Sequence, residues 1–223
     1  MKIKLLIRGI LAIIGGVVMV MLPLYLSAGT VDYPHMWLMA AVLFIPMLLM
    51  GIVMFVKAPD LLEKRLKNKE TEDTQKTVIL LAFFMFMAGF CACGIDYRFD
   101  GASVPWSVSV VSAVAFLVGY GMYAEVLREN AYLSRVIEVQ DGQKLIDTGL
   151  YAVVRHPMYT ATVLMFCTMP LVLGSLWGFV IFLVYPFILV GRIKNEEKVL
   201  AEGLEGYTNY IKRVRYRMIP FIW

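Results

Sequence analysis

The 223-residue chain is poor in the side chains that build metal centres and disulfide frameworks. Of its three cysteines, Cys91 and Cys93 are two positions apart and so point in different directions on a helix, while Cys167 lies in another apolar run. Its two histidines, His35 and His156, are far apart in the sequence. We therefore expect neither a disulfide framework nor a metal site.

Charge is also scarce, at 17% of the residues, whereas 60% are hydrophobic and the mean hydropathy is +0.73. A soluble core does not need so much apolar side chain, so the composition predicts an integral membrane protein. No charged residue lies in the middle of the first four apolar runs, which argues against an ion pathway. The chain also lacks a strand–GxGxxG–helix unit, which excludes a Rossmann cofactor domain.

Four apolar runs are long enough to cross a bilayer as helices: 5–26, 36–56, 77–95 and 106–127. The first is too long for the apolar part of a signal peptide and is expected to remain as a span. A fifth block, 159–190, is too long for one comfortable span and is broken at Gly174-Ser175, so we expect two short helices forming a hairpin. The predicted fold is thus an all-α integral membrane protein with about six transmembrane helices. Glycines inside the spans, Gly15-Gly16 and Gly119 with Gly121, predict close helix approach.

Basic residues are distributed very unevenly along this pattern. With the N-terminus in the cytosol, 20 of the 21 Lys and Arg residues fall on the cytosolic side, and Arg98 alone falls on the outer side. This skew follows the positive-inside rule and predicts that both termini are cytosolic. We interpret the charged linker 58–76 as a solvated loop or surface helix.

We divide the chain into a four-helix transmembrane region, 1–127, and a second region, 128–223, with the hairpin and C-terminal helices. The polar segment 128–154 is too short to fold alone, so it must pack on the membrane helices or cover something they hold. Gly203 and Gly206 predict a break between two C-terminal helical pieces. Residues 214–223 combine arginines with aromatics, a pattern typical of an anchor at headgroup level.

Two groups of polar residues border the last apolar block. In Arg155-His156-Pro157-Met158-Tyr159, Pro157 suits the first turn of a helix and places His156 just outside it, where free amides favour an anion. Taken alone, these five residues are better explained as a juxtamembrane anchor followed by a helix-starting proline, because so short a motif is not specific. Arg192 and Glu196 are four residues apart and share a helix face. They form either a surface ion pair or part of a site.

Together these pieces resemble the isoprenylcysteine carboxyl methyltransferase family, whose wider group includes phospholipid N-methyltransferases. The resemblance rests on VQDGQKLIDTGLYAVVRHPMYTA, on the spacing of Arg192, Glu196-Glu197 and Leu200, and on the closing GYTNYIKRVRYRMIPFIW. It covers residues 135–223. In two places the chain departs from the family pattern: Gln143 stands where a histidine is usual, and Ala161 where glycine is frequent.

The resemblance implies that S-adenosylmethionine is the cofactor and that region 128–223 is catalytic. It assigns Arg192 to an acidic substrate, and Glu196 to catalysis and to the cofactor. The other cofactor contacts that it implies are Gln140, Gln143, Leu145, Ile146, Tyr151, His156, Pro157, Met158 and Tyr159.

Several functions remain open at this stage. The leading one is methylation of an isoprenylcysteine-like or other lipid carboxylate at the cytosolic interface. The others are methylation of a phospholipid amine, NADPH-dependent reduction of a sterol or enone, and a non-catalytic membrane role. We expect a lipophilic or prenylated small molecule and membrane lipids as partners, and no nucleic acid.

Overall fold

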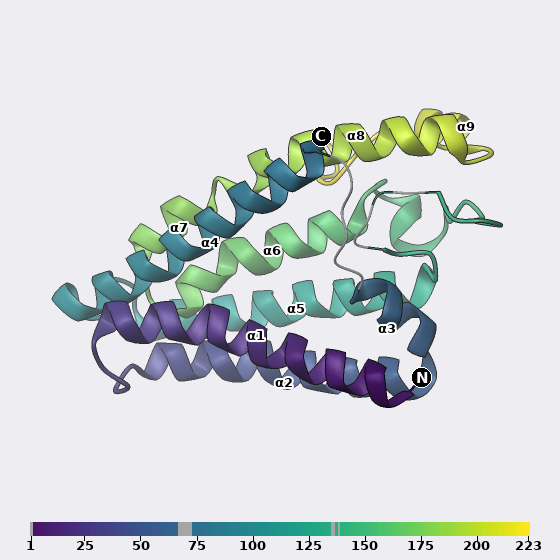
Figure 1. Cartoon of the computed structure of the whole chain (residues 1–223). Helices are drawn as coiled ribbons and strands as arrows, with labels where there is room; N and C mark the ends of the chain where they lie inside the picture. Colours follow the sequence, from purple (N-terminus) through teal and green to yellow (C-terminus); the bar gives the residue numbers. More distant parts are fainter. Residues whose placement is uncertain (1, 67–72, 135–136, 138) are drawn as a thin grey trace.

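The computed structural model describes residues 2–66, 73–134, 137 and 139–223, and it places long helices side by side in one bundle (Figure 1). The helices are α1 (Lys2–Ala28), α2 (Pro34–Lys57), α3 (Pro59–Arg65), α4 (Asp73–Asp100), α5 (Trp106–Glu129), α6 (Pro157–Val172), α7 (Leu176–Phe182), α8 (Tyr185–Gly203) and α9 (Tyr207–Arg213). A single 3-10 turn, η1, covers Gly149–Ala152. The described residues form no strand.

The predicted membrane-protein fold is confirmed. Among the described residues, five helical stretches are long and apolar enough to cross a membrane, namely α1, α2, residues Lys76–Asp100 of α4, α5 and the stretch Leu176–Gly203 of α7 and α8. Helix α6 is apolar but shorter, with 16 residues, and does not reach that length. The expected hairpin between α6 and α7 turns at Gly174, whose φ of +79° suits glycine. The expected break after α8 also occurs, between Gly203 and Tyr207.

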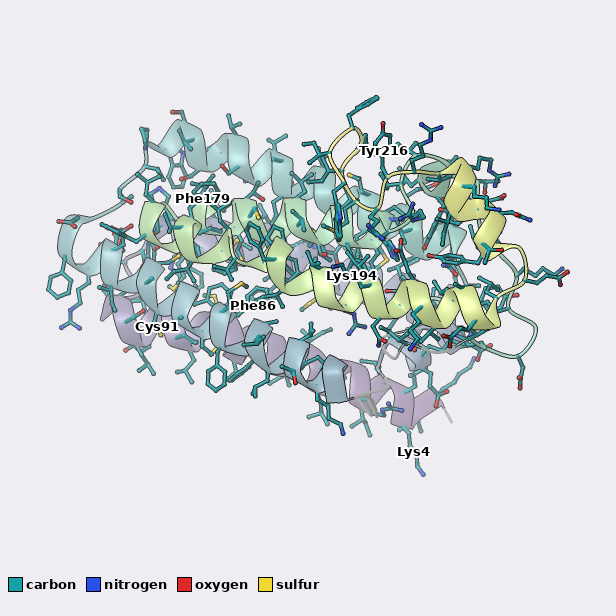
Figure 2. The ribbon with its side chains drawn as sticks, turned by 90° about the horizontal axis from the view of Figure 1, so that it is seen from above. Lys4, Phe86, Cys91, Phe179, Lys194 and Tyr216 are labelled. Carbon is teal, nitrogen blue, oxygen red and sulfur yellow. The ribbon has the colours of Figure 1, made fainter. Side chains whose placement is uncertain are left out.

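The chain alternates direction through the bundle, so the N-terminus, α3, α9 and the segment before α6 lie toward one end, which we call the site end (Figure 1). Lys4, Lys194 and Tyr216 lie in that half of the molecule, whereas Cys91 and Phe179 lie in the other half (Figure 2). The core between the helices combines aliphatic side chains and methionines with aromatic residues, of which Tyr33, Phe90, Phe116 and Phe182 are completely buried.

The linker between α2 and α4 is attached to the bundle more firmly than the sequence suggests. Within it, α3 buries Leu61 against Met54 and Leu127. Lys64 and Arg65 donate hydrogen bonds to the backbone carbonyls of residues 131 and 134. The expected surface helix is therefore present as α3, but its apolar face is packed against the bundle instead of being solvated. Residues 67–72 of the linker lie outside the described residues.

A buried carboxylate fastens the hairpin turn at the end opposite the site. Asp96 is 4% exposed and accepts hydrogen bonds from the hydroxyls of Ser103 (2.7 Å) and Ser175 (2.6 Å). Ser175 also caps α7 by accepting a hydrogen bond from the amide of Gly178. These bonds fix where α6 ends and α7 begins, and thereby the direction in which α8 runs toward the site.

Two glycines allow close helix contacts. A Cβ atom at Gly119 would lie 2.8 Å from the Met165 side chain, so α5 and α6 touch there as the sequence predicts. A Cβ at Gly94 would lie 2.8 Å from backbone atoms of both Leu24 and Ala28, where α4 crosses α1. These pairs of helices therefore approach one another nearly backbone to backbone.

The other glycines expected at close contacts do not serve that purpose. A Cβ at Gly15 or Gly121 would meet no atom within 4 Å, and one at Gly16 would make an ordinary contact of 3.8 Å. That expectation is wrong at these positions, because spacing alone does not show which face of a helix meets a neighbour.

Membrane orientation gives the first testable prediction. The skew of the basic residues predicts that a reporter fused at either terminus reads cytosolic, and that one inserted within residues 27–32 reads external. An accessibility assay on intact cells measures both. A cytosolic signal from residues 27–32, or an external one from either terminus, would contradict the prediction.

Helix packing gives the second testable prediction. The substitution Gly94→Ala should lower the melting temperature in detergent, because the added methyl group meets backbone that cannot move away, at a cost of about 1–3 kcal/mol. Gly15→Ala adds the same group to another helix in open space and serves as the matched control. Equal melting temperatures for the two variants would show that the α1–α4 contact is looser than described.

Candidate active site

The site is built around the turn that begins α6. Pro157 occupies the first helical position, and His156 precedes it with φ of −125°, outside the helix as expected from the sequence. The backbone amide of Arg155 donates to the carbonyl of Tyr216 (2.9 Å), and that of His156 donates to the carbonyl of Arg217 (2.8 Å). Residues 214–217 therefore lie against the start of α6, and we call them the C-terminal strap.

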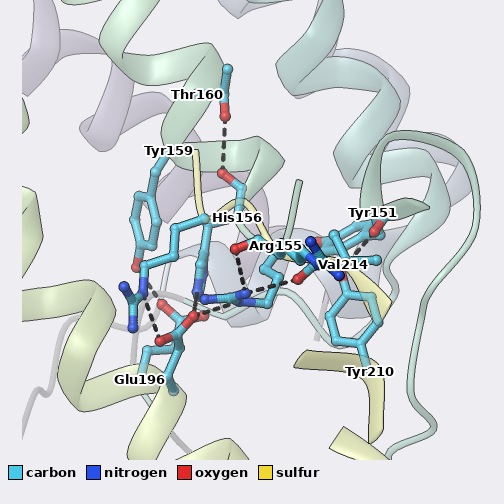
Figure 3. A network of polar contacts seen from close by, with 11 residues as sticks. Tyr151, Arg155, His156, Tyr159, Thr160, Glu196, Tyr210 and Val214 are labelled. Atoms are coloured by element: carbon cyan, nitrogen blue, oxygen red, sulfur yellow. Dashed lines mark hydrogen bonds and ion pairs between the residues drawn. The ribbon is translucent and has the colours of Figure 1, made fainter. Parts of the chain in front are cut away.

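A buried ion cluster joins this turn to α8 and to the strap. Glu197 accepts hydrogen bonds from Nε of Arg155 (2.7 Å) and Nε of Arg217 (2.8 Å), and its Oε1 lies 3.4 Å from Nε2 of His156. The side chains of Arg155 and Glu197 are 4% and 10% exposed. Arg155 also donates to the carbonyls of Val214 and Arg215 (Figure 3). The cluster thus neutralises the carboxylate while it ties three segments together.

A second polar chain lies beside this cluster. Nε of Arg192 donates to the hydroxyl of Tyr159 (2.8 Å), and this hydroxyl donates to Oε2 of Glu196 (2.6 Å). Tyr159 is 4% exposed and lies beside His156, with the two ring centroids 5.6 Å apart. Arg192 and Glu196 are therefore both held by a buried phenol. Figure 3 shows the Tyr159 side chain pointing toward Glu196.

These groups border one cavity at the site end, with a volume of about 90 Å³. Ten of the predicted site residues line it: Gln143, Leu145, Ile146, Tyr151, His156, Pro157, Met158, Tyr159, Arg192 and Glu196. Gln140 is not among the lining residues. Its side-chain amide donates to the carbonyl of Tyr132, and its backbone amide donates to Gln143 Oε1 (2.9 Å), so it shapes the covering segment instead.

Aromatic residues that were not predicted as site residues form much of the remaining wall of the cavity. Tyr207 and Tyr210 come from α9, and the Tyr210 hydroxyl donates to the carbonyl of Tyr151 (2.7 Å). The Tyr207 hydroxyl is buried and has no hydrogen-bond partner among the described residues. Their helical spacing was consistent with simple packing, and no local signal distinguished the two roles.

Burial keeps these phenols in their neutral form. Loss of hydration raises the pKa of Tyr151 to about 12, although a hydrogen bond from Asn130 (2.9 Å) acts in the opposite direction. Burial likewise raises the pKa of Tyr207 and that of Tyr210. All three are therefore hydrogen-bond donors at neutral pH, and none is a base.

The segment over the cavity is attached mainly to the C-terminal helices. Val139 and Leu145 pack against the small cluster that contains Leu204, Tyr207 and Tyr210. An ion pair between Asp147 and Arg213 adds to this contact at the surface. The expectation that this segment packs on the helices and closes over something is consistent with this position, since it forms one wall of the cavity.

Comparison with known proteins now adds to the geometry. Residues 108–205 match the family model described as phospholipid methyltransferase. One curated relative, the Delta(14)-sterol reductase TM7SF2 of Mus musculus, is 30% identical over 90 residues. The aligned part is 39% of this chain and 22% of the reductase, so the chain spans only about a fifth of that protein.

The family match runs from α5 through α8 and includes the turn at Arg155, the Tyr159 hydroxyl, and the Arg192 and Glu196 side chains. Apolar helices long enough to span a membrane accompany it. Over residues 108–205, this multi-pass membrane protein is thus similar to the phospholipid methyltransferase family, and the wider group expected from the motifs fits this part of the chain.

Proposed function

We propose that this protein transfers a methyl group from S-adenosylmethionine to the carboxylate of a lipophilic acceptor at the cytosolic membrane surface, as isoprenylcysteine carboxyl methyltransferases do. One observation carries the proposal. Nine of the ten predicted cofactor positions line a single cavity, and Arg192 lines it with them. These residues come from the covering segment, α6 and α8, which are far apart in sequence.

The chemistry of the lining residues suits this cofactor. Glu196 offers a carboxylate to an amino group or ribose. The positive dipole end of α6 favours a carboxylate, although Pro157 has no amide hydrogen and the amides of Tyr159 and Thr160 already donate to the His156 carbonyl. The unpartnered Tyr207 hydroxyl offers a further hydrogen bond. The tyrosine rings are favourable neighbours for a cation such as a sulfonium.

The cavity is smaller than the roughly 300–1,000 Å³ of most ligand sites. Binding therefore requires the covering segment to move outward. Its exposed Asp147–Arg213 ion pair opposes this motion weakly, since such pairs contribute only about 0–1 kcal/mol.

When bound, S-adenosylmethionine supplies an electrophilic methyl group. The protein must then hold an acceptor in line with it and keep water away. Arg192 can bind an acceptor carboxylate through its planar guanidinium. Tyr159 fixes both Arg192 and Glu196 through one hydroxyl, which positions the acceptor side of the site relative to the cofactor side.

The surroundings of the site favour an acid over an amine as acceptor. A carboxylate is ionised near neutral pH and needs no general base. An amine would have to lose a proton, and the candidate bases are otherwise engaged. Glu196 accepts the Tyr159 hydroxyl bond, and His156 faces Glu197 within the buried ion cluster.

The similarity to the mouse sterol reductase supports a second candidate, reduction of a lipophilic enone with NADPH. Equilibrium binding of S-adenosylmethionine and of NADPH to the purified protein separates the two. Binding of NADPH without binding of S-adenosylmethionine would favour the reductase.

The third prediction concerns the cofactor. Glu196→Ala should weaken S-adenosylmethionine binding roughly ten- to a hundred-fold, since a charge-assisted hydrogen bond contributes about 1.5–3 kcal/mol. Glu202→Ala removes an exposed carboxylate from the same helix and is the matched control. Isothermal titration measures both affinities. Equal affinities in the two variants would place the cofactor elsewhere.

The fourth prediction concerns the acceptor. Arg192→Lys keeps the charge but loses the planar fork, so it should lower kcat/KM for a lipid carboxylate while S-adenosylmethionine still binds. If Arg192 serves only to hold Glu196 through Tyr159, Arg192→Ala should instead weaken cofactor binding as much as Glu196→Ala does. Methylation of an amine lipid at full rate by Arg192→Ala would contradict the acid assignment.

A further inference from the structure

A second cavity, which we call the apolar groove, opens between α1, α2, α3 and α5. Its volume is about 340 Å³, within the range of about 300–1,000 Å³ usual for ligand sites. Leu5 and Ile10 of α1, Met47 of α2 and Leu127 of α5 are among its apolar lining residues. None of its described lining residues also lines the site cavity.

Missing side chains create part of this space. Gly9 of α1 and Gly51 of α2 both line the groove, and a Cβ atom at either position would meet no atom within 4 Å. Here glycine leaves a gap between helices, whereas Gly94 and Gly119 bring helices into contact. A side chain added at position 9 or 51 would therefore begin in open space within the groove.

Arg65 stands where the apolar groove meets the site. It is half-buried, lines the groove and bonds to the hydroxyl of Tyr123, which also lines the groove. Its Nη1 also donates to the carbonyl of Ser134 (3.4 Å) and lies 3.9 Å from Sδ of Met158. Ser134 and Met158 both line the site cavity. A single cation therefore separates a hydrocarbon-lined space from a polar one.

The geometry points to a binding site for a single-chain anionic amphiphile, with its hydrocarbon chain in the apolar groove and its acidic head group at Arg65. Two observations favour this occupant over a neutral lipid. The described partners of Arg65, namely the hydroxyl and ring of Tyr123, the Ser134 carbonyl and the Met158 sulfur, are all uncharged, so they satisfy its hydrogen bonds without neutralising its charge. The groove also has almost no other polar lining, so the favourable place for an acidic head group is at Arg65. We assign this amphiphile as the methyl acceptor, and this assignment rests on the proposed function. Its carboxylate would pass Arg65 to reach Arg192.

Photolabelling tests the groove without any methyl transfer. The full chain is reconstituted in phosphatidylcholine nanodiscs without cofactor and is labelled with a diazirine fatty acid or with the matching diazirine fatty alcohol. We expect the acid to label groove residues several-fold more than the alcohol does. Arg65→Gln should remove this preference, whereas Lys64→Gln, on the same helix but outside the groove lining, should keep it.

Filling the apolar groove gives an independent variant that does not disturb Arg65. The double substitution Gly9→Leu with Gly51→Leu should reduce labelling several-fold, while Gly15→Leu, in open space outside the groove lining, should not. Equal labelling by acid and alcohol in the unaltered protein would overturn the site, as would labelling that persists after the groove is filled.

Kinetics tests the acceptor role. With N-acetyl-S-farnesylcysteine as acceptor, the filled variant should show a several-fold higher KM at nearly unchanged kcat. An unchanged KM would overturn the acceptor role. If the unaltered protein transfers no methyl group to any lipid, the proposed function and the acceptor role fail together, and labelling of the groove distinguishes that result from failure of the groove itself.

Discussion

The carboxylate of Glu197 is the interaction on which the site depends. It receives Arg155 from the turn before α6 and Arg217 from the C-terminal strap, and it belongs to α8 itself. Breaking a buried ion pair costs about 3–5 kcal/mol because the remaining charge has no partner, so these three segments stay together. Successive residues of a helix point about 100° apart. As a result, Glu197 faces the strap, while Glu196 faces the cavity and meets Tyr159.

The rest of the fold serves to deliver these segments to one place. At the opposite end, Asp96 and Ser175 fix the hairpin turn, so that α6 leaves the site and α8 returns to it. The close contact at Gly94 holds α4 against α1, and the one at Gly119 holds α5 against α6. A small cluster around α9 receives the covering segment, which forms one wall of the cavity. The membrane bundle thus supports a site whose last wall comes from a segment outside the long helices.

Some residues that matter most gave little sign of it in the sequence. Glu197 looked like one member of an acidic pair, and Tyr207 like part of a packing stripe. Residues 214–223 looked like an interfacial anchor, a description that still suits Phe221 and Ile222, which are 88% and 76% exposed, but the strap within them lies against the start of α6. Helix α3 looked solvated because its charges outnumber its apolar residues, yet Leu61 is buried. In each case the residue is held by contacts with residues far away in the sequence, and no local sequence pattern indicates those contacts.

The sequence by itself determined the spans, the hairpin with its break at Gly174, the start of α6 at Pro157 and the residue types of the site. These features follow from local physics: hydrocarbon thickness sets the length of apolar runs, and proline and glycine restrict or free the backbone nearby. Only the tertiary structure decided which glycines touch a neighbour, which carboxylate is buried, and that Arg65 lies between the apolar groove and the cavity. Those outcomes depend on how helices rotate and pack against one another, which is settled by contacts between residues distant in the chain.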